Sequence, residues 1–196
     1  MSCQYPASGC DAALTVPLGH RLMPVTGDTL AMPDGTSFSI VESAADSGGK
    51  RVEFEISMAP GALGPPKHFH PRQEENWNVL EGELSVFVDD GWRTLGEGES
   101  LSIPPDTVHT LRNRSPGVVR FRDVHEPALD FQDYIEALHR QAAAGKITSR
   151  MTPSTLVHAA MVLHQHRTTQ LSASPVQRTA ETVLSLIGRA LGFRTS

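Results

Sequence analysis

The 196-residue chain has only two cysteines, no long apolar run and no excess of basic residues. Two cysteines, Cys3 and Cys10, cannot frame a disulfide scaffold, and we expect them to be reduced thiols. No stretch is apolar for long enough to span a bilayer. The first twenty residues also lack the charged start and apolar block of a secretory signal. We therefore expect a cytoplasmic protein with no membrane partner.

Basic charge is scarce as well: 17 Lys and Arg stand against 22 Asp and Glu, for a net charge of −5. Proteins that bind nucleic acids neutralise phosphates with clustered Lys and Arg, so we expect no nucleic-acid partner. Hydrophobic residues make up 39% and charged residues 20% of the chain, which is typical of a globular protein. The length is sufficient for one main domain with a substantial core.

The period of the apolar residues divides the chain into three stretches. Residues 1–28 are irregular and contain several Pro and Gly, which predicts an N-terminal arm. Residues 29–126 carry short alternating runs separated by turns, which predicts an antiparallel sandwich or barrel. The expected strands are 37–41, 51–58, 76–80, 83–88, 92–95, 100–103, 108–113 and 118–124. Asp90-Gly91 predicts a hairpin turn between two of them.

From residue 127 the period becomes helical, which predicts a C-terminal helical extension over residues 127–196. Asp130 is the expected N-cap of a first helix that stops at Gly145. Thr152-Pro153 would begin a second helix, and Ser174-Pro175 a third. These helices would pack on the barrel or on a second subunit.

Histidines and carboxylates in residues 68–109 have spacings suited to a metal ion. In an extended strand side chains alternate, so His68 and His70 point to the same face, about 6 to 7 Å apart along the chain. Two imidazoles placed in this way can reach one ion. Glu75 follows at the start of the next strand, and a Pro-rich turn with a return strand would bring back His109.

The first block of these residues, from position 62 to Gly82, resembles the first sequence motif of the cupin family. That motif is a glycine, five residues, His-x-His, three or four residues, Glu, six residues and Gly. The chain matches it from His68 through Glu75 to Gly82, with Ala62 in place of the opening glycine. Glu74 also has an allowed spacing, but only Glu75 places Gly82 correctly, so Glu75 is preferred.

The second block resembles the second cupin motif, which is Gly, five residues, Pro-x-Gly, two residues, His, three residues and Asn. Gly98, Pro104, His109 and Asn113 fit, and Asp106 replaces the inner glycine. Asp tolerates tight turns, so the turn should be retained. The resemblance covers about residues 35 to 126.

The resemblance implies a mainly β fold, a cupin-type antiparallel β-barrel of the double-stranded β-helix or jelly-roll kind. By the same resemblance, His68, His70, Glu75 and His109 hold one divalent transition metal, and the chain forms a homodimer. Imidazole and carboxylate donors suit Fe, Mn, Ni, Co, Cu or Zn, and the sequence does not choose among these ions.

We expect a metal-dependent enzyme that acts on a small organic substrate. A quercetinase-like cupin would be a dioxygenase that chelates its substrate at the metal, with Glu75 also acting as a base. One alternative is a non-redox isomerase, cyclase or decarboxylase, in which the metal is a Lewis acid. Another is a non-catalytic ligand-binding protein.

Other aromatic and histidine side chains have weaker support from the sequence. Trp77, Phe87 and Phe121 are candidates either for lining a pocket or for plain core. His164 and His166 lie two apart on an expected helix, where side chains diverge by roughly 200°, so both should be solvated. The histidines without supporting spacing are His20, His125, His139 and His158.

Overall fold

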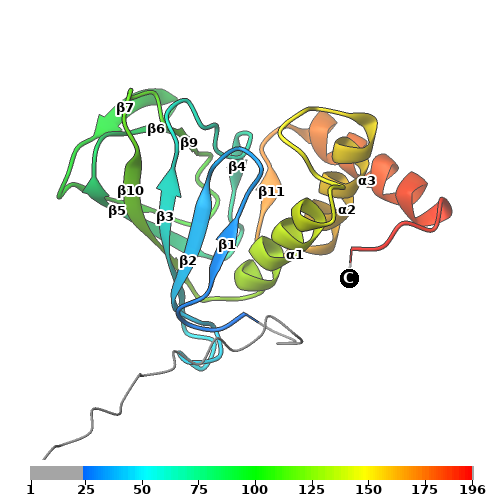
Figure 1. The fold of residues 1–196 in the computed structure, drawn as a ribbon, viewed down its shortest axis with the longest axis horizontal. Helices are drawn as coiled ribbons and strands as arrows, with labels where there is room; N and C mark the ends of the chain where they lie inside the picture. Colours follow the sequence, from blue (N-terminus) through cyan, green and yellow to red (C-terminus); the bar gives the residue numbers. More distant parts are fainter. Residues whose placement is uncertain (1–23, 196) are drawn as a thin grey trace, which may run out of the picture.

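A computed structural model describes residues 24–195 of the protein. Cys3, Cys10 and most of the predicted N-terminal arm lie outside the described residues. Figure 1 shows the strands gathered on one side of the molecule and the helices on the other. Among residues 24–195, no helix combines the length and apolar character that crossing a bilayer requires.

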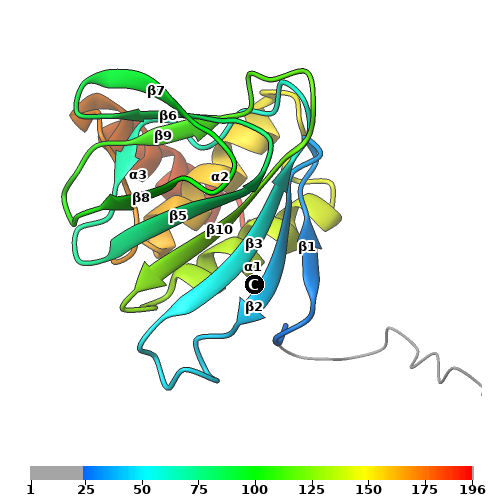
Figure 2. The same cartoon turned by 90° about the vertical axis from the view of Figure 1, so that its left-hand side faces the viewer.

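The strands pair antiparallel throughout, which confirms the predicted mainly β fold class. They are β1 (Thr29–Ala31), β2 (Ser37–Glu42), β3 (Val52–Met58), β4 (His68–Phe69), β5 (Glu74–Glu81), β6 (Leu84–Val88), β7 (Gly91–Leu95), β8 (Ser100–Ile103), β9 (Thr110–Arg112), β10 (Val119–Glu126) and β11 (Leu171–Ser172). Figure 2 shows the six-stranded sheet β1-β2-β3-β10-β5-β8 with the sheet β7-β6-β9 beside it. Each expected strand is present, whereas the short strands β1, β4 and β11 were not expected.

Alternation explains how the barrel forms its core. In β3, Val52, Phe54, Ile56 and Met58 are all buried on one face. Phe121 of β10 is buried on the adjoining strand, opposite Ile56. Burying an apolar side chain of this size contributes roughly 1.5–3 kcal/mol, so this inward face is the main source of barrel stability.

The hairpin between β6 and β7 turns one residue earlier than expected. Val88 pairs with Gly91, so the two central residues are Asp89 and Asp90. Their φ angles are 53° and 62°, the left-handed values that a two-residue hairpin of this type requires at both positions. Aspartate tolerates this conformation, which leaves Gly91 free to begin β7.

Three helices follow the last barrel strand. They are α1 (Phe131–Ala143), α2 (Pro153–Gln165) and α3 (Pro175–Ala190). Thr152 Oγ1 accepts a hydrogen bond from the Thr155 amide, and Ser174 Oγ accepts one from the Gln177 amide. Both side chains therefore cap the helices that follow them, as expected.

Asp130 is the N-cap residue of α1, as predicted, but its side chain bonds elsewhere. The Asp130 side chain makes no cap hydrogen bond. Its carboxylate accepts hydrogen bonds from His166 Nδ1 at 2.9 Å and Thr168 Oγ1 at 2.6 Å. The expectation that His166 is solvated is therefore wrong: it ends α2 as a buried residue, because the chain folds back onto Asp130 there.

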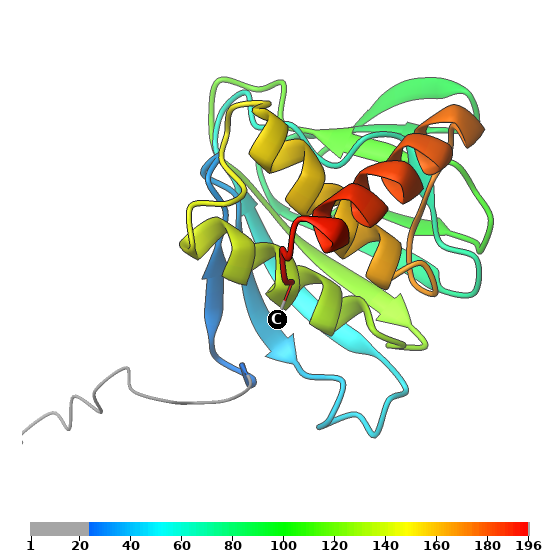
Figure 3. The same cartoon turned by 90° about the vertical axis from the view of Figure 1, so that its right-hand side faces the viewer.

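The helices lie across one side of the barrel (Figure 3). α3 packs on α2 at Gly188, where an added Cβ would lie 2.3 Å from Met161 Sδ. The apolar residues Leu186, Ile187 and Leu191 of the α3 segment are exposed. This segment therefore does not cover the barrel mouth, and a subunit interface on it stays a prediction.

Candidate metal centre

A backbone bridge brings two of the predicted ligands together. The His68 amide donates to the His109 carbonyl at 3.0 Å, and the His109 amide donates back at 2.9 Å. Their imidazole centroids are 4.3 Å apart. The His70 ring, two residues along the same face, lies 5.1 Å from that of His68 and 5.2 Å from that of His109.

Strand β5 supplies the carboxylate from the opposite wall. Glu75 and Trp77 both point into the barrel, because side chains alternate along the strand. Glu75 Oε2 lies 2.7 Å from His109 Nε2 and 3.4 Å from His70 Nε2. Glu75 Oε1 accepts a hydrogen bond from Trp77 Nε1 at 2.8 Å, which fixes the orientation of the carboxylate.

The three imidazoles are oriented by backbone carbonyls. Each Nδ1 of His68, His70 and His109 hydrogen-bonds to a carbonyl oxygen; these belong to Pro66, Thr169 and Thr107, respectively. A carbonyl can only accept, so each Nδ1 carries the proton. In a neutral ring Nε2 is then unprotonated and can bind a metal ion.

The four side chains fit a divalent transition metal. One donor atom from each lies within 4.8 Å of all the others, and all four residues are buried. Within residues 24–195, Nε2 of His70, Nε2 of His109 and Oε2 of Glu75 have no hydrogen-bond partner. Buried polar atoms normally have hydrogen-bond partners, so these unpaired atoms suggest a bound group. Three imidazoles with one carboxylate form a donor set suited to divalent transition metals.

The side chains of the group shift one another's pKa values. Burial would raise the pKa of Glu75, but His109 and His125 outweigh it and hold this pKa well below its usual range. Burial, together with neighbouring His109 and His70, puts the pKa of His68 well below its usual value. Glu75 outweighs the burial of His109 and raises its pKa.

Two further polar residues that the sequence analysis did not assign to the site stand beside Glu75. His125 Nε2 lies 3.6 Å from Glu75 Oε1 and 3.3 Å from Asp123 Oδ1. Asp123 and His125 are buried, and burial raises the pKa of Asp123. The alternation of β10 contains the signal: Val119 and Phe121 are apolar inward positions, and Asp123 and His125 continue the same face.

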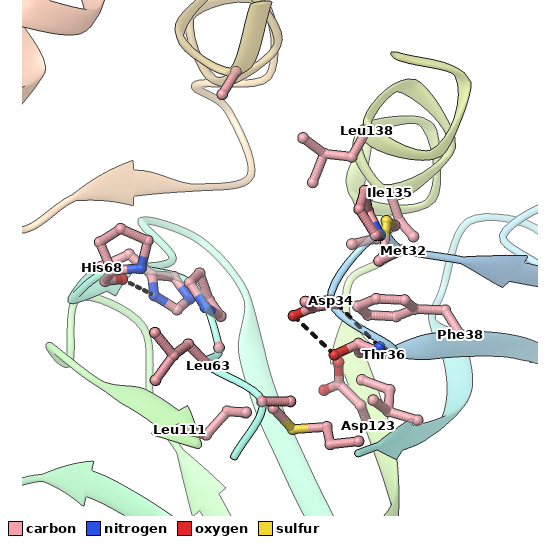
Figure 4. A pocket seen from close by; sticks show the side chains of 18 of the residues that line it. Met32, Asp34, Thr36, Phe38, Leu63, His68, Leu111, Asp123, Ile135 and Leu138 are labelled. Carbon is pink, nitrogen blue, oxygen red and sulfur yellow. Dashed lines mark hydrogen bonds between the residues drawn. The ribbon is translucent and has the colours of Figure 1, made fainter. Parts of the chain in front are cut away.

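A cavity of about 680 Å³ opens from the metal centre toward the helices. Figure 4 shows His68 and Leu63 on one side of it and Ile135 and Leu138 of α1 on the other. Its lining includes His68, His70, Glu75, Trp77, Phe121, Asp123, Tyr134, Ala159 and Gln170. Most of the remaining lining residues are apolar, and the described part of the chain contributes no Lys or Arg to the lining.

Of the three aromatic side chains that were candidates for lining a pocket, two line this cavity and one does not. Trp77 and Phe121 line it, as considered from the sequence. Phe87 does not belong to its lining; its ring instead lies beneath Lys67 Nζ, which is 3.3 Å from the ring centroid.

The two departures from the cupin motifs have simple structural explanations. Asp106, in place of glycine, has φ = 62° and therefore keeps the left-handed turn. Ala62, in place of the opening glycine, is buried without a positive φ. Gly82, which does match, has φ = 80°, and a Cβ there would lie 2.7 Å from the Val118 carbonyl oxygen.

Comparison with protein families agrees with this architecture. Residues 54–125 match the family model of the cupin domain. This region runs from β3 into β10 and includes all four candidate ligands. The match is limited to residues 54–125, and the helical extension lies outside the matched region.

Individual relatives match about two fifths of the chain. The HTH-type transcriptional regulator SutR of Escherichia coli strain K12 is 33% identical over 75 residues, 38% of this chain and 42% of that protein. Mannose-1-phosphate guanylyltransferase of the same strain is 34% identical over 74 residues, 38% of this chain and 15% of that protein. The chain thus spans less than half the length of either relative. Among solved structures, KdgF from Halomonas sp. has a TM-score of 0.46 at 22% identity, covering 53% of this chain and 90% of that chain.

Proposed function

We propose that the protein is a metal-dependent enzyme that acts on a small, mainly apolar organic molecule. The observation that carries this proposal is the position of the four donors, which stand at the wall of an apolar cavity. His68, His70, Glu75 and His109 would hold the ion. When bound, it would supply Lewis acidity and, if redox-active, a site for dioxygen chemistry.

The lining of the cavity favours an uncharged substrate. A phosphate or carboxylate group is usually bound by Arg or Lys, and neither residue type lines this cavity among residues 24–195. Gln170 Nε2 donates a hydrogen bond to Tyr134 Oη at 3.3 Å, so this pair offers polar atoms in a mainly apolar wall. Neutral enols, diketones and catechols combine apolar area with oxygen atoms, so these classes fit best.

Two carboxylates stand where a substrate proton could be taken. Glu75 would accept it at Oε2, because Trp77 Nε1 bonds to the other oxygen, Oε1. Asp123 lines the cavity, and its Oδ1 makes no hydrogen bond within residues 24–195. The cavity walls would exclude water from this transfer.

The reaction class that we propose first is dioxygenation of a chelated substrate. A second candidate is a non-redox isomerisation, cyclisation or decarboxylation. The neighbouring Asp123–His125 pair favours this second class, because enolate chemistry needs groups that take up and return a proton.

The test begins with metal analysis of protein purified without a polyhistidine tag, followed by turnover of an enol, diketone and catechol panel. About one metal ion per chain and dioxygen-dependent turnover would support the first candidate. Turnover under strict exclusion of dioxygen would support the second. Binding without turnover by the metal-loaded protein would favour a non-catalytic ligand-binding protein.

A His109→Ala variant tests the site assignment, with His139→Ala as its control. His139 lies on α1, where Nδ1 hydrogen-bonds to the Ala31 carbonyl, and it is absent from the candidate ligand group. Full metal content in His109→Ala would contradict the assignment. The homodimer and the cytoplasmic location stay predictions, and light scattering of the purified protein would test the first.

A further inference from the structure

We propose that Thr169 and Gln73 are positioning residues for the metal ligand His70, so that the helical extension completes the metal centre. This inference rests on the metal site proposed above. It concerns a segment between α2 and α3 that lies outside the matched cupin region, and we call residues 166–173 the docking segment.

The docking segment adds a strand to the barrel beside the first ligand. In β11, Leu171 pairs with Phe69 and Ser172 pairs with His68. The Ala173 amide continues the pairing by donating to the Lys67 carbonyl at 2.9 Å. The position of the segment is therefore determined relative to the backbone that carries His68 and His70.

Support for the three histidine ligands is unequal. His68 and His109 each bond to a carbonyl only two residues earlier in the chain. Their orientation is therefore a property of the local turn. His70 instead bonds through Nδ1 to the carbonyl of Thr169, 99 residues later. Its orientation depends on a contact that only the extension can make.

Gln73 hydrogen-bonds to Thr169 and so fixes the His70–Thr169 contact relative to the barrel. Its side-chain oxygen accepts a hydrogen bond from Thr169 Oγ1, and its Nε2 donates to the carbonyls of Pro127 at 2.9 Å and Ala128 at 3.0 Å. Gln73 and Thr169 are both 0% exposed. One amide group therefore joins the loop after His70, the start of the extension and the docking segment.

The chemical consequence concerns the tautomer of His70. With Nδ1–H donated to a carbonyl, the neutral ring presents an unprotonated Nε2 toward Glu75. Without that carbonyl, the ring could carry its proton on Nε2 or rotate, and either change removes a metal donor. Thr169 and Gln73 would therefore set metal affinity without touching the metal.

The test is titration with Co²⁺ alone, followed by its visible absorption, on the full chain. Thr169→Val removes the hydroxyl that Gln73 holds, and we expect Co²⁺ binding to weaken about tenfold with an altered spectrum. Thr169→Ser should restore both. Thr168→Val is the matched control, because Thr168 Oγ1 bonds to Asp130 and makes no contact with His70.

Wild-type affinity and spectrum in Thr169→Val, or an equal loss in Thr168→Val, would overturn the inference. A second measurement needs no variant: nitrogen NMR of histidine-labelled wild type should show His70 protonated at Nδ1. A proton on Nε2 of the neutral ring would overturn the inference even if Thr169→Val failed to fold. If the wild type bound no Co²⁺, the metal site and this inference would both fail. Equal Co²⁺ binding by the wild type and by Thr169→Val would refute only the inference.

Discussion

Glu74 and Glu75 are neighbours in the sequence, but their side chains lie on opposite faces of β5. Glu75 is 4% exposed and faces the three histidines. Glu74 is exposed and accepts hydrogen bonds from Ser102 Oγ at 2.8 Å and Asn76 Nδ2 at 3.2 Å. The strand pleat therefore selects one carboxylate of two that both have an allowed spacing from His70, and it selects the one that also fits Gly82.

This relationship gives a matched pair of variants. Glu75→Gln should lower the affinity for Co²⁺ or Zn²⁺ by about 100-fold or more, because it removes a charged ligand from a buried site. Glu74→Gln makes the same chemical change on the outer face and should leave metal affinity within about twofold. Titration followed by calorimetry measures both, and an equal loss in the two variants would contradict the proposed ligand set.

Metal binding should release a proton. Glu75 outweighs the burial of His109 and raises its pKa, so the metal-free protein keeps the His109 proton to a higher pH than an ordinary histidine does. A metal ion needs the neutral ring, so binding must displace that proton, and apparent affinity should fall as pH falls through this pKa. Calorimetry in buffers of different ionisation heat measures the release, and heats independent of the buffer would contradict the prediction.

The cavity should bind uncharged apolar molecules independently of the metal. Ala159 of α2 lines the cavity, and an Ala159→Phe side chain would occupy part of its volume. Overfilling such a space costs about 1–3 kcal/mol, which corresponds to about 10- to 100-fold weaker binding of an apolar dye such as Nile red. Ala190→Phe, the same change at an exposed position of α3, is the control. Dye fluorescence that responds equally to both variants would place the dye elsewhere.

Asn113 should matter for stability and not for metal binding. Its Nδ2 donates to the carbonyls of Met58, Ala59 and Gly117, at 2.7 to 3.1 Å. Asn113→Ala leaves these acceptors without their donor and should lower the free energy of unfolding by about 2–3 kcal/mol. Asn78→Ala, which removes a single exposed hydrogen bond to Ser100, should cost less than about 0.5 kcal/mol. Urea unfolding measures both, and similar losses would refute the role of Asn113.

The regular elements could be predicted because local chemistry determines them. Alternation in β3 predicted its buried face, and Thr152 and Ser174 marked two helix starts by their capping hydroxyls. The short strands were missed because distant contacts, not local chemistry, determine them. β4 and β11 have two residues each, too few for a period, and they form only because the extension docks on the barrel.

The candidate site was predictable to a similar extent. The spacing of the two motifs identified the four residues that the fold brings together. His125 lacked such spacing, and only the register that places it opposite Glu75 shows that it belongs to the site. Asp130 is at the predicted N-cap position, but its side-chain partners were not predictable, because His166 and Thr168 come from a distant segment.

The dependence of His70 on Thr169 also constrains the order of events during folding. The last barrel strand, β10, ends at Glu126, so the ribosome completes the barrel sequence well before it makes residue 169. Domains generally fold as they emerge, so a nascent barrel would hold two oriented imidazoles and one free to turn. We therefore expect metal capture to be a late event. In hydrogen exchange during refolding, protection of the Ala173 amide, which donates to the Lys67 carbonyl, should arise together with tight metal binding. Tight binding before that protection would exclude this order.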